Sequence, residues 1–362
     1  MISLFKDDWE AACRRMDAWW AGEIVDRCVV MVTAPRDHPV GNIREPKPPL
    51  NVEQLWLDAE YRVAAAEARF ATTFYGGEAI PTFFPNLGPG IAATYIGVEP
   101  VFAEETVWFD QDPVVKSYGG RQPIRLEENN HWWQVTQELT RASLAKSENR
   151  WVTAMTDLGG SLDLVASLRG TKTLLMDLID YPSEVKRLTA EVDQVWLHCF
   201  QELDHMIRQQ MEGTSSWMHI WCRDTWYPFQ CDCSAMFSPQ MFEEFVLPSL
   251  QEQCRQLDYS IYHWDGPGQI PHLDLLLSMP ELTGIQWVPG DGNPGVESPK
   301  WFPLYKRIQA AGKNLVLLGA PLHSVESIVK ELSPKGLLIS THADTEDEAR
   351  SLLNDVAKWS AR

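Results

Sequence analysis

The stretch SIYHWDGPG, residues 260–268, places an imidazole and a carboxylate at the end of a strand. Side chains on a strand alternate between its two faces, so His263 and Asp265 point the same way. The glycine-proline-glycine turn at 266–268 then ends the strand. In folds built on parallel sheets, ligands bind at the carboxyl ends of strands. The stretch therefore predicts either a functional site or a strand-end histidine that pairs with a neighbouring carboxylate.

Seven other short apolar runs also have the composition of a strand, and segments with a helical pattern separate them. Most of these runs are continuously apolar, as expected for strands that are buried on both faces. Strands that alternate with helices indicate a parallel sheet, and eight such units in 362 residues predict an α/β fold, a (β/α)8 TIM-like barrel. The eight predicted strands are 28–35, 80–85, 152–158, 215–221, 260–265, 284–290, 314–320 and 336–343.

Helical signals set the predicted organisation of the chain. Apolar residues recur with a helical period over 183–207, Ser238 and Pro239 are typical of a helix start, and Thr345 with Glu348 forms a capping box. We expect an N-terminal helical extension over 1–27 and a single barrel domain over 28–362. Extra length at about 97–150 predicts an insertion near the barrel mouth, consisting of a hairpin and a helix.

The composition limits the classes of partner. The chain has 31 Lys and Arg against 50 Asp and Glu, a formal net charge of −19, which argues against nucleic acid because phosphate backbones are repelled. No run of about 18 apolar residues occurs, so we expect no membrane partner. The seven cysteines are scattered, which is typical of reduced thiols in a cytoplasmic protein.

If the predicted strands form a barrel, their carboxyl ends meet at one mouth, and that mouth is rich in acids, imidazoles and aromatic rings. The opposite strand ends have none of these groups. The candidate catalytic residues are His263, Asp265 and Asp157. The candidate substrate-binding residues are Asn86, Trp221, Arg223, Asp224, Gln286 and Trp287.

Two chemistries fit these residues. In the first, His263 and Asp265 bind zinc with a third ligand, for which His342 on the last strand is our choice and Cys222 and Asp232 are alternatives. A catalytic zinc ion takes about three protein ligands and keeps one open position. In the second, no metal is bound, and Asp157, Asp265 and His263 act as acid and base on a small substrate.

Longer segments resemble the uroporphyrinogen decarboxylase superfamily. The resemblance covers most of residues 150–360 and is weaker before that, where only NLGPGIAATYIGVEP (86–100) is similar. The segments that show it are TDLGGSLDLVASLRGTKTLLMDLIDYPSEVKRL (156–188), FSPQMFEEFVLPSLQEQC (237–254), the strand SIYHWDG and the tail GLLISTHADT.

This resemblance implies a (β/α)8 barrel and one of two activities. The decarboxylase branch implies an Arg-Gln-Ala-Gly-Arg-Tyr-like motif, which the segment VTAPRDHPVG (32–41) lacks. The methyltransferase branch implies a zinc site made of His-x-Cys and a second Cys near the last strand. His263 matches that motif, but Asp265 stands in place of the first Cys, and the last strand offers His342. A carboxylate makes the site harder, which favours demethylation of an oxygen- or nitrogen-linked methyl group.

The leading hypothesis is therefore a methyltransferase. It would move a methyl group between a small methylated substrate and a corrinoid at a zinc site. This chain lacks the Asp-x-His-x-x-Gly corrinoid motif, so a corrinoid-binding partner protein would supply the corrinoid. The first alternative is a metal-free barrel enzyme, a lyase, decarboxylase or carbohydrate-acting enzyme, that uses Asp/His acid–base catalysis. The second alternative is a non-catalytic ligand-binding relative.

Overall fold

The computed structural model describes residues 4–109, 112–127 and 129–361. A seven-stranded sheet in the order β2-β1-β11-β10-β9-β8-β7 forms its centre. Strands β7 to β11 and β1 run parallel, whereas β2 is antiparallel to β1. The strands are β1 (Val29–Pro35), β2 (Thr73–Gly77), β7 (Trp226–Gln230), β8 (Tyr259–Asp265), β9 (Gly284–Val288), β10 (Asn314–Leu317) and β11 (Leu337–His342).

Two small strand pairs complete the described β-structure. The strands β3 (Thr82–Phe83) and β6 (Val152–Thr153) form a parallel pair, and β4 (Val101–Phe102) and β5 (Val107–Trp108) form an antiparallel hairpin. The Met155 N–H donates to the Ser215 carbonyl at 2.9 Å, so the chain around 215 runs beside the end of β6. That segment lies between β6 and β7 in the sequence but pairs with neither as a strand.

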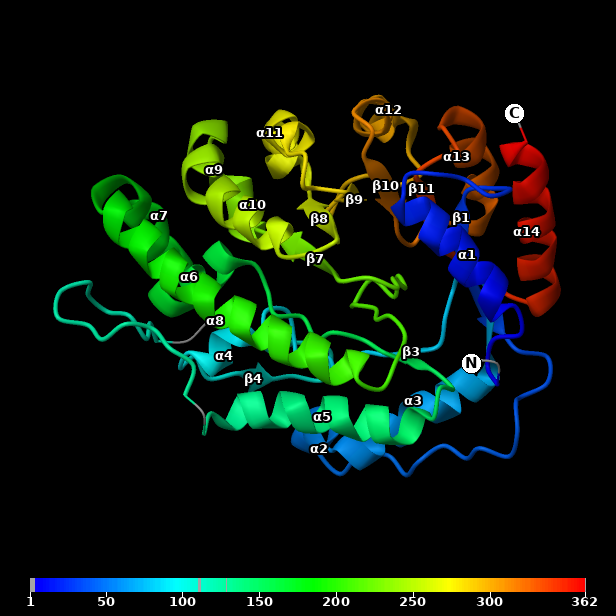
Figure 1. The fold of residues 1–362 in the computed structure, drawn as a ribbon, viewed down its shortest axis with the longest axis horizontal. Helices are drawn as coiled ribbons and strands as arrows, with labels where there is room; N and C mark the ends of the chain where they lie inside the picture. Colours follow the sequence, from blue (N-terminus) through cyan, green and yellow to red (C-terminus); the bar gives the residue numbers. More distant parts are fainter. Residues whose placement is uncertain (1–3, 110–111, 128, 362) are drawn as a thin grey trace.

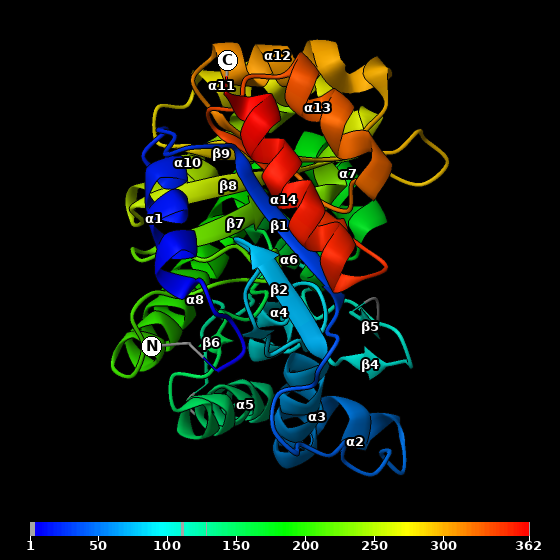
Figure 2. The same ribbon diagram turned by 90° about the vertical axis from the view of Figure 1, so that its right-hand side faces the viewer.

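Helices surround the strands on two sides (Figures 1 and 2). Helices α11 to α14 follow one another outside the sheet, and α2, α3 and α5 lie on the opposite side of the molecule. The helices are α1 (Trp9–Trp20), α2 (Val52–Leu57), α3 (Ala59–Thr72), α4 (Ala92–Tyr95), α5 (His131–Ser147), α6 (Ser161–Arg169), α7 (Thr171–Asp180), α8 (Pro182–Arg208), α9 (Pro239–Phe245), α10 (Leu247–Arg255), α11 (Leu273–Ser278), α12 (Phe302–Ala310), α13 (Val325–Glu331) and α14 (Glu346–Ser360).

The sheet has an outer face toward the helices and an inner face. On β8, Tyr262 and Trp264 belong to the large core cluster shared with the helices, whereas Ile261 belongs to a second cluster. The same alternation places Val316 of β10 and Leu338 of β11 in the second, inner cluster. Because strand side chains alternate with period two, the polar residues in step with Ile261 also face inward.

Helix α1 closes the amino ends of the strands. Trp20 packs on Trp226 of β7 and Tyr259 of β8, with ring centroids 5.1 and 5.2 Å apart. Its indole N–H donates to the carbonyl of Trp221, and the Asn314 amide donates to the carbonyl of Trp19. The inner face is therefore sealed by apolar packing at this end.

The structure confirms the predicted α/β class, the alternation of strands with helices and the parallel sheet. Closure into one eight-stranded barrel is not confirmed, because hydrogen bonds divide the described strands among the seven-stranded sheet and the two small pairs. The strand β2 was not expected. It adds an antiparallel neighbour to β1 at the edge of the large sheet.

The predicted strand 215–221 is wrong. Its apolar side chains Met218 and Ile220 are buried, but His219 has a left-handed backbone with φ of 57° and its N–H donates to the Ser216 carbonyl in a turn. The actual strand is β7, which contains Pro228 and was not among the predicted strands. Proline is tolerated there because β7 is the last strand in the sheet order, where a ladder N–H is not required on the open side.

Several helix signals are confirmed. Ser238 caps α9, Thr345 caps α14, and the stripe over 183–207 lies on α8. The helix expected after Ser238 breaks in two at Val246, because Pro248 cannot continue the hydrogen-bond ladder. The segment 97–150 contains the β4–β5 hairpin and α5, and its residues 110, 111 and 128 lie outside the described residues. Among the described helices, none is long and apolar enough to cross a membrane.

Candidate functional site

Three neighbouring strands place polar side chains level with one another at the inner face. The parallel register aligns Gln230 of β7 with His263 of β8, and His263 with Gln286 of β9. Their neighbours along each strand pack in the helix-side core, so these three side chains point inward. Asp265 lies two residues further along β8, on the same face.

The carboxyl end of β8 brings together two carboxylates and one imidazole. One ligand atom from each of Asp232, His263 and Asp265 lies within 4.8 Å of the others. Asp232 begins a short 3-10 helix directly after β7, the strand adjacent to β8. The arrangement therefore joins the two residues predicted from SIYHWDGPG to Asp232, which was an alternative third ligand.

The imidazole of His263 is held in one orientation. Its Nδ1–H donates to Oε1 of Gln286 at 2.5 Å, which leaves Nε2 as the nitrogen with a free lone pair. The ring of Trp217 meets it nearly at right angles, with centroids 5.1 Å apart. Burial lowers the pKa of His263, so the imidazole is neutral near neutral pH. A neutral imidazole whose second nitrogen is hydrogen-bonded is the usual state of a metal-ligating histidine.

Asp163 of α6 fixes the turn that presents Asp232. Its Oδ2 accepts the Asp232 N–H at 2.8 Å, and its Oδ1 accepts the Cys233 N–H at 3.0 Å. Burial raises the pKa of Asp163. The role of this residue is to position the turn, because both of its oxygens are used by backbone donors.

The charge at this site is not balanced by the protein. The pKa of Asp232 rises to about 8, because protein atoms enclose its carboxyl on the inner side and because Asp163, Asp265 and Asp157 repel its charged form. The charged groups that act on it are all carboxylates. Asp232 nevertheless remains exposed on its outer side. A bound cation would relieve this repulsion.

The donor set is compatible with a divalent metal ion. Zinc accepts imidazole nitrogen and carboxylate oxygen as ligands, and in catalytic sites it takes three protein ligands and keeps one position open. His263, Asp265 and Asp232 provide three such ligands on adjacent elements. Two carboxylates also make the site harder than a thiolate site, which favours oxygen and nitrogen as the additional ligand.

Two cavities lie near the cluster, and of the three ligands only Asp265 lines one of them. The larger has a volume of about 770 Å³, and Trp217, the ring that contacts His263, forms part of its wall. The second, of about 690 Å³, is lined by Asp265 and by the loop after β9, and Leu318 borders both cavities. The 690 Å³ cavity therefore offers a small molecule room beside Asp265, and the 770 Å³ cavity lies beyond the Trp217 ring.

A second cluster joins Asp163 to the thiols of Cys231 and Cys233, whose sulfur atoms lie 3.7 Å apart. Burial raises the pKa of Cys231, and the hydrogen bond with Cys231 followed by burial raises that of Cys233. Both thiols are therefore neutral near neutral pH. Since Asp163 is engaged by backbone donors, this cluster is a packing feature of the turn.

Asp157, a predicted catalytic residue, is buried beside the cluster and lines neither cavity. Its Oδ1 accepts the Gly159 N–H at 2.9 Å and the Tyr227 hydroxyl at 3.3 Å. Burial raises its pKa to about 6, and these hydrogen bonds oppose that shift. The structure gives this residue a place in the turn after β6.

Three predicted substrate-binding residues lie at the wrong end of the sheet. Trp221 is buried against Trp9, and Arg223 forms salt bridges with Asp17 and Glu212. Asp224 is exposed. The physical reason is the wrong strand assignment: residues 221–224 precede β7 rather than follow a strand, so they lie at its amino end. Cys222, an alternative metal ligand, is buried in the same place.

The other predicted binding residues have different positions. Gln286 lies at the cluster and contacts His263. Trp287 faces the helices, fully buried between Trp264 and Trp301, so it cannot contact a ligand at the inner face. Asn86 lines a separate cavity of about 560 Å³ beside α3, and its Oδ1 accepts the Gly88 N–H.

The predicted third ligand, His342, does not join His263 and Asp265. It lies on β11, and β9 and β10 separate that strand from β8 in the sheet order. Its Nδ1 is 3.1 Å from the Thr33 hydroxyl, and the residue lines the 770 Å³ cavity. The sequence contained no signal for Arg69, Trp217 or His219, which also line that cavity, because they lie on a helix and a loop rather than at strand ends.

Comparisons with known proteins give the fold. No family model matches the chain, and no curated protein matches it. Among solved structures, the chain is similar to a methyltransferase from Methanosarcina mazei, with a TM-score of 0.59 and 15% sequence identity over 96% of this chain and 98% of the other. The two proteins share their fold over nearly their whole lengths.

Proposed function

We propose that this protein is a methyltransferase that moves a methyl group between a small methylated substrate and a corrinoid held by a partner protein. The observation that supports the proposal best is the cluster of Asp232, His263 and Asp265 at the carboxyl end of β8. Trp217, whose ring contacts His263, lines a cavity of about 770 Å³. The fold shared with a methyltransferase supports this reaction class. The superfamily resemblance of residues 150–360 suggests the corrinoid acceptor.

We further propose zinc as the metal, with Asp232 in place of His342 as the third ligand. When bound, zinc supplies a Lewis acid that withdraws electron density from the heteroatom bearing the methyl group. Gln286 orients the His263 ring through Nδ1, and Asp163 orients Asp232 through its backbone. The low local dielectric strengthens these interactions.

We also propose demethylation as the direction, and the donor set favours a type of substrate. In demethylation, the bond between carbon and the heteroatom breaks, the heteroatom keeps the electron pair, and the methyl group passes to the cobalt of a reduced corrinoid. Two carboxylates at the cluster suit an oxygen or nitrogen heteroatom better than sulfur. Met31, Met218 and Trp217 give the 770 Å³ cavity a partly apolar and aromatic wall, which suits the hydrocarbon part of a small methylated compound.

The test is methyl transfer to free cob(I)alamin in the presence of zinc, followed by the absorbance change on conversion to methylcobalamin. A panel of O-methyl, N-methyl and S-methyl compounds is assayed with the wild type and with Asp265→Asn. Asp224→Asn is the matched control, because it makes the same chemical change at an exposed position at the amino end of β7. We expect transfer by the wild type and the control, and no transfer by Asp265→Asn. No transfer by the wild type from any class, or equal rates in the two variants, would contradict the proposal.

A metal-free acid–base enzyme is the second candidate, and one observation favours it. Without a cation, the raised pKa of Asp232, about 8, leaves a protonated carboxyl beside the neutral imidazole of His263 near neutral pH. Such a pair is suited to donate and accept protons. Protein that binds no metal even after incubation with zinc would favour this candidate, and lyase and carbohydrate substrates would then be assayed.

A further inference from the structure

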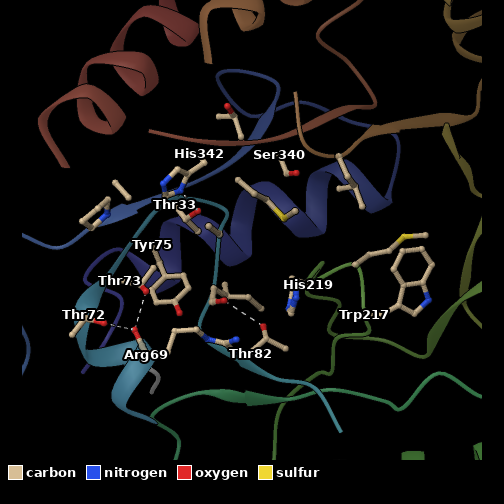
Figure 3. Close-up of a pocket in the computed structure, with 18 residues that line it drawn as sticks. Thr33, Arg69, Thr72, Thr73, Tyr75, Thr82, Trp217, His219, Ser340 and His342 are labelled. Carbon is tan, nitrogen blue, oxygen red and sulfur yellow. Dashed lines mark hydrogen bonds between the residues drawn. The ribbon is translucent and has the colours of Figure 1, made fainter. Parts of the chain in front are cut away.

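The 770 Å³ cavity has one charged end. Figure 3 shows the residues that line it, which come from β1, α3, β2, β11 and the loop at 217–219. Most of the wall consists of apolar side chains and neutral hydroxyls. Among its described lining residues, Arg69 of α3 is the sole Lys, Arg, Asp or Glu.

The guanidinium of Arg69 has no protein partner in the described part of the chain. The hydrogen bonds recorded for this residue are those of its backbone carbonyl, which accepts the hydroxyls of Thr72 and Thr73. Its guanidinium lies over the face of Phe70, at 5.5 Å from the ring centroid. Arg69 is an exposed residue, so its guanidinium is open to a ligand, whereas the buried arginines Arg27 and Arg169 are paired with Glu78 and Asp177.

Neutral hydrogen-bonding groups accompany Arg69. His219 borders both this cavity and the smaller one beside α3, as Arg69 does, and its left-handed backbone turns it into the space between them. Burial and the neighbouring Arg69 charge lower the pKa of His219 to about 4, so it is neutral near neutral pH. In Figure 3, Tyr75, Thr82 and His219 surround the end of the Arg69 side chain.

We propose that Arg69 binds a carboxylate group of the substrate. This inference rests on the proposed function, because it assigns the anionic end of the methylated compound. A guanidinium offers two parallel N–H donors, which match the two oxygens of a carboxylate. A phosphate is a poorer match, because its second negative charge has no further Lys or Arg among the described lining residues.

The position of Arg69 also sets the orientation of the substrate. In Figure 3, Arg69 and Trp217 lie on opposite sides of the cavity, and Trp217 is the residue that contacts His263. A carboxylate at Arg69 therefore leaves the other end of the molecule at Trp217, the wall residue whose ring contacts the proposed ligand His263. Met31, Ile80 and Met218 line the cavity and suit a hydrocarbon body between the two ends. The substrate class is a small apolar carboxylic acid with its methylated heteroatom remote from the carboxylate.

The test measures binding without zinc or corrinoid, so that its outcome is independent of methyl transfer. Butyrate, benzoate and phenylacetate are titrated calorimetrically against the full chain, together with their neutral amides. The variants are Arg69→Gln, Arg69→Lys and the control Arg141→Gln, which removes the same charge from an exposed position on α5. Circular dichroism checks that each variant is folded.

We expect the wild type and Arg141→Gln to bind at least one carboxylate more tightly than its amide. Arg69→Gln weakens carboxylate binding by about 10- to 100-fold and leaves amide binding unchanged, as expected for loss of a charge-assisted hydrogen bond. Arg69→Lys restores part of the affinity, because it keeps the charge but loses the second donor. Equal binding by wild type and Arg69→Gln, equal binding of acid and amide, or no carboxylate binding by the wild type would overturn the inference. Each of these results leaves the methyl transfer assay to decide the proposed function separately.

Discussion

The two ends of the inner face differ in how their charges are compensated. At the amino end, the buried carboxylate of Glu78 accepts both Arg27 nitrogens at 2.7 and 2.8 Å and the Val30 N–H at 2.9 Å. At the carboxyl end, the carboxylates of Asp232 and Asp265 lie beside a neutral imidazole. The protein itself therefore balances the charge at the amino end, whereas the charged groups that act on Asp232 at the carboxyl end are further carboxylates.

Packing shows the same contrast. The amino end is filled by α1 and by stacked aromatic rings such as Trp20 on Tyr259. The carboxyl end is bordered by cavities of about 770 and 690 Å³. Uncompensated charge and empty space both reduce the stability of a folded protein. Proteins therefore keep them mainly where they serve a ligand. The contrast assigns stability to the amino end and function to the carboxyl end.

The first expected effect, at the carboxyl end, is on metal-dependent stability. Asp265→Asn removes one ligand and one repelling charge, so the variant without metal is at least as stable as the wild type. Zinc at about 100 times its dissociation constant stabilises the wild type by about 2.7 kcal/mol and leaves the variant unchanged. Thermal unfolding with and without zinc measures both effects. A variant that is less stable without metal, yet still stabilised by zinc, would show that Asp265 is a structural residue.

At the amino end, the expected effect is on stability alone. Glu78→Ala leaves Arg27 buried without its partner, which lowers the free energy of unfolding by about 3–5 kcal/mol. Glu244→Ala is the control, since it breaks an exposed pair with Lys186 and costs less than about 1 kcal/mol. Urea denaturation gives the two values, and zinc content per folded molecule stays the same. A change in zinc content in Glu78→Ala would remove the proposed separation of the two ends.

Asp157 gives a pH-dependent effect of similar size. The folded-state pKa of Asp157, about 6, lies above the ordinary 3.8. The contribution of this group to the free energy of unfolding is therefore fully present below about pH 3.8, and it is lost as the pH rises through about 6. Relative to Asp157→Asn, the wild type therefore loses about 3 kcal/mol of unfolding free energy between about pH 4 and pH 7. Urea denaturation across this range measures the difference. A difference that is independent of pH would contradict the assigned environment of Asp157.

The smallest expected effect tests the orientation of His263. Gln286→Leu removes the acceptor for Nδ1–H and weakens zinc binding by about 10- to 100-fold. Gln230→Leu is the matched control, because Gln230 lies level with His263 on the other neighbouring strand. Zinc titration against a competing chelator compares the two variants. Equal losses of affinity would mean that packing at this level, not the hydrogen bond, governs binding.

The sequence was most informative where periodicity and local chemistry coincide. The strand at 260–265 and the helices at 183–207 and after Thr345 follow from apolar spacing and caps, and the structure contains them. The shared direction of His263 and Asp265 follows from the period of a strand, and the cluster unites them. Such features depend only on neighbours in the chain.

The parts of the fold and of the site that the sequence did not predict depend on contacts between distant segments. The buried run at 215–221 has the composition of a strand but no partner in a ladder, whereas β7 contains a proline and still forms one. Because β7 is the strand and 215–221 is not, Trp221 and Arg223 lie at the opposite end of the sheet from the one predicted. The third ligand was decided by strand order, which places Asp232 beside β8 and His342 three strands away. Arg69 became a candidate only when its lack of a partner was visible.

The most direct test of the central claim is the zinc content of purified protein by elemental analysis, in the wild type and two variants. The proposed site predicts one zinc ion per wild-type chain, loss of zinc in Asp232→Ala, and full retention in His342→Ala. Retention in Asp232→Ala with loss in His342→Ala would show that the last strand supplies the third ligand. Absence of zinc from all three proteins, even after incubation with zinc, would contradict the metal-dependent account.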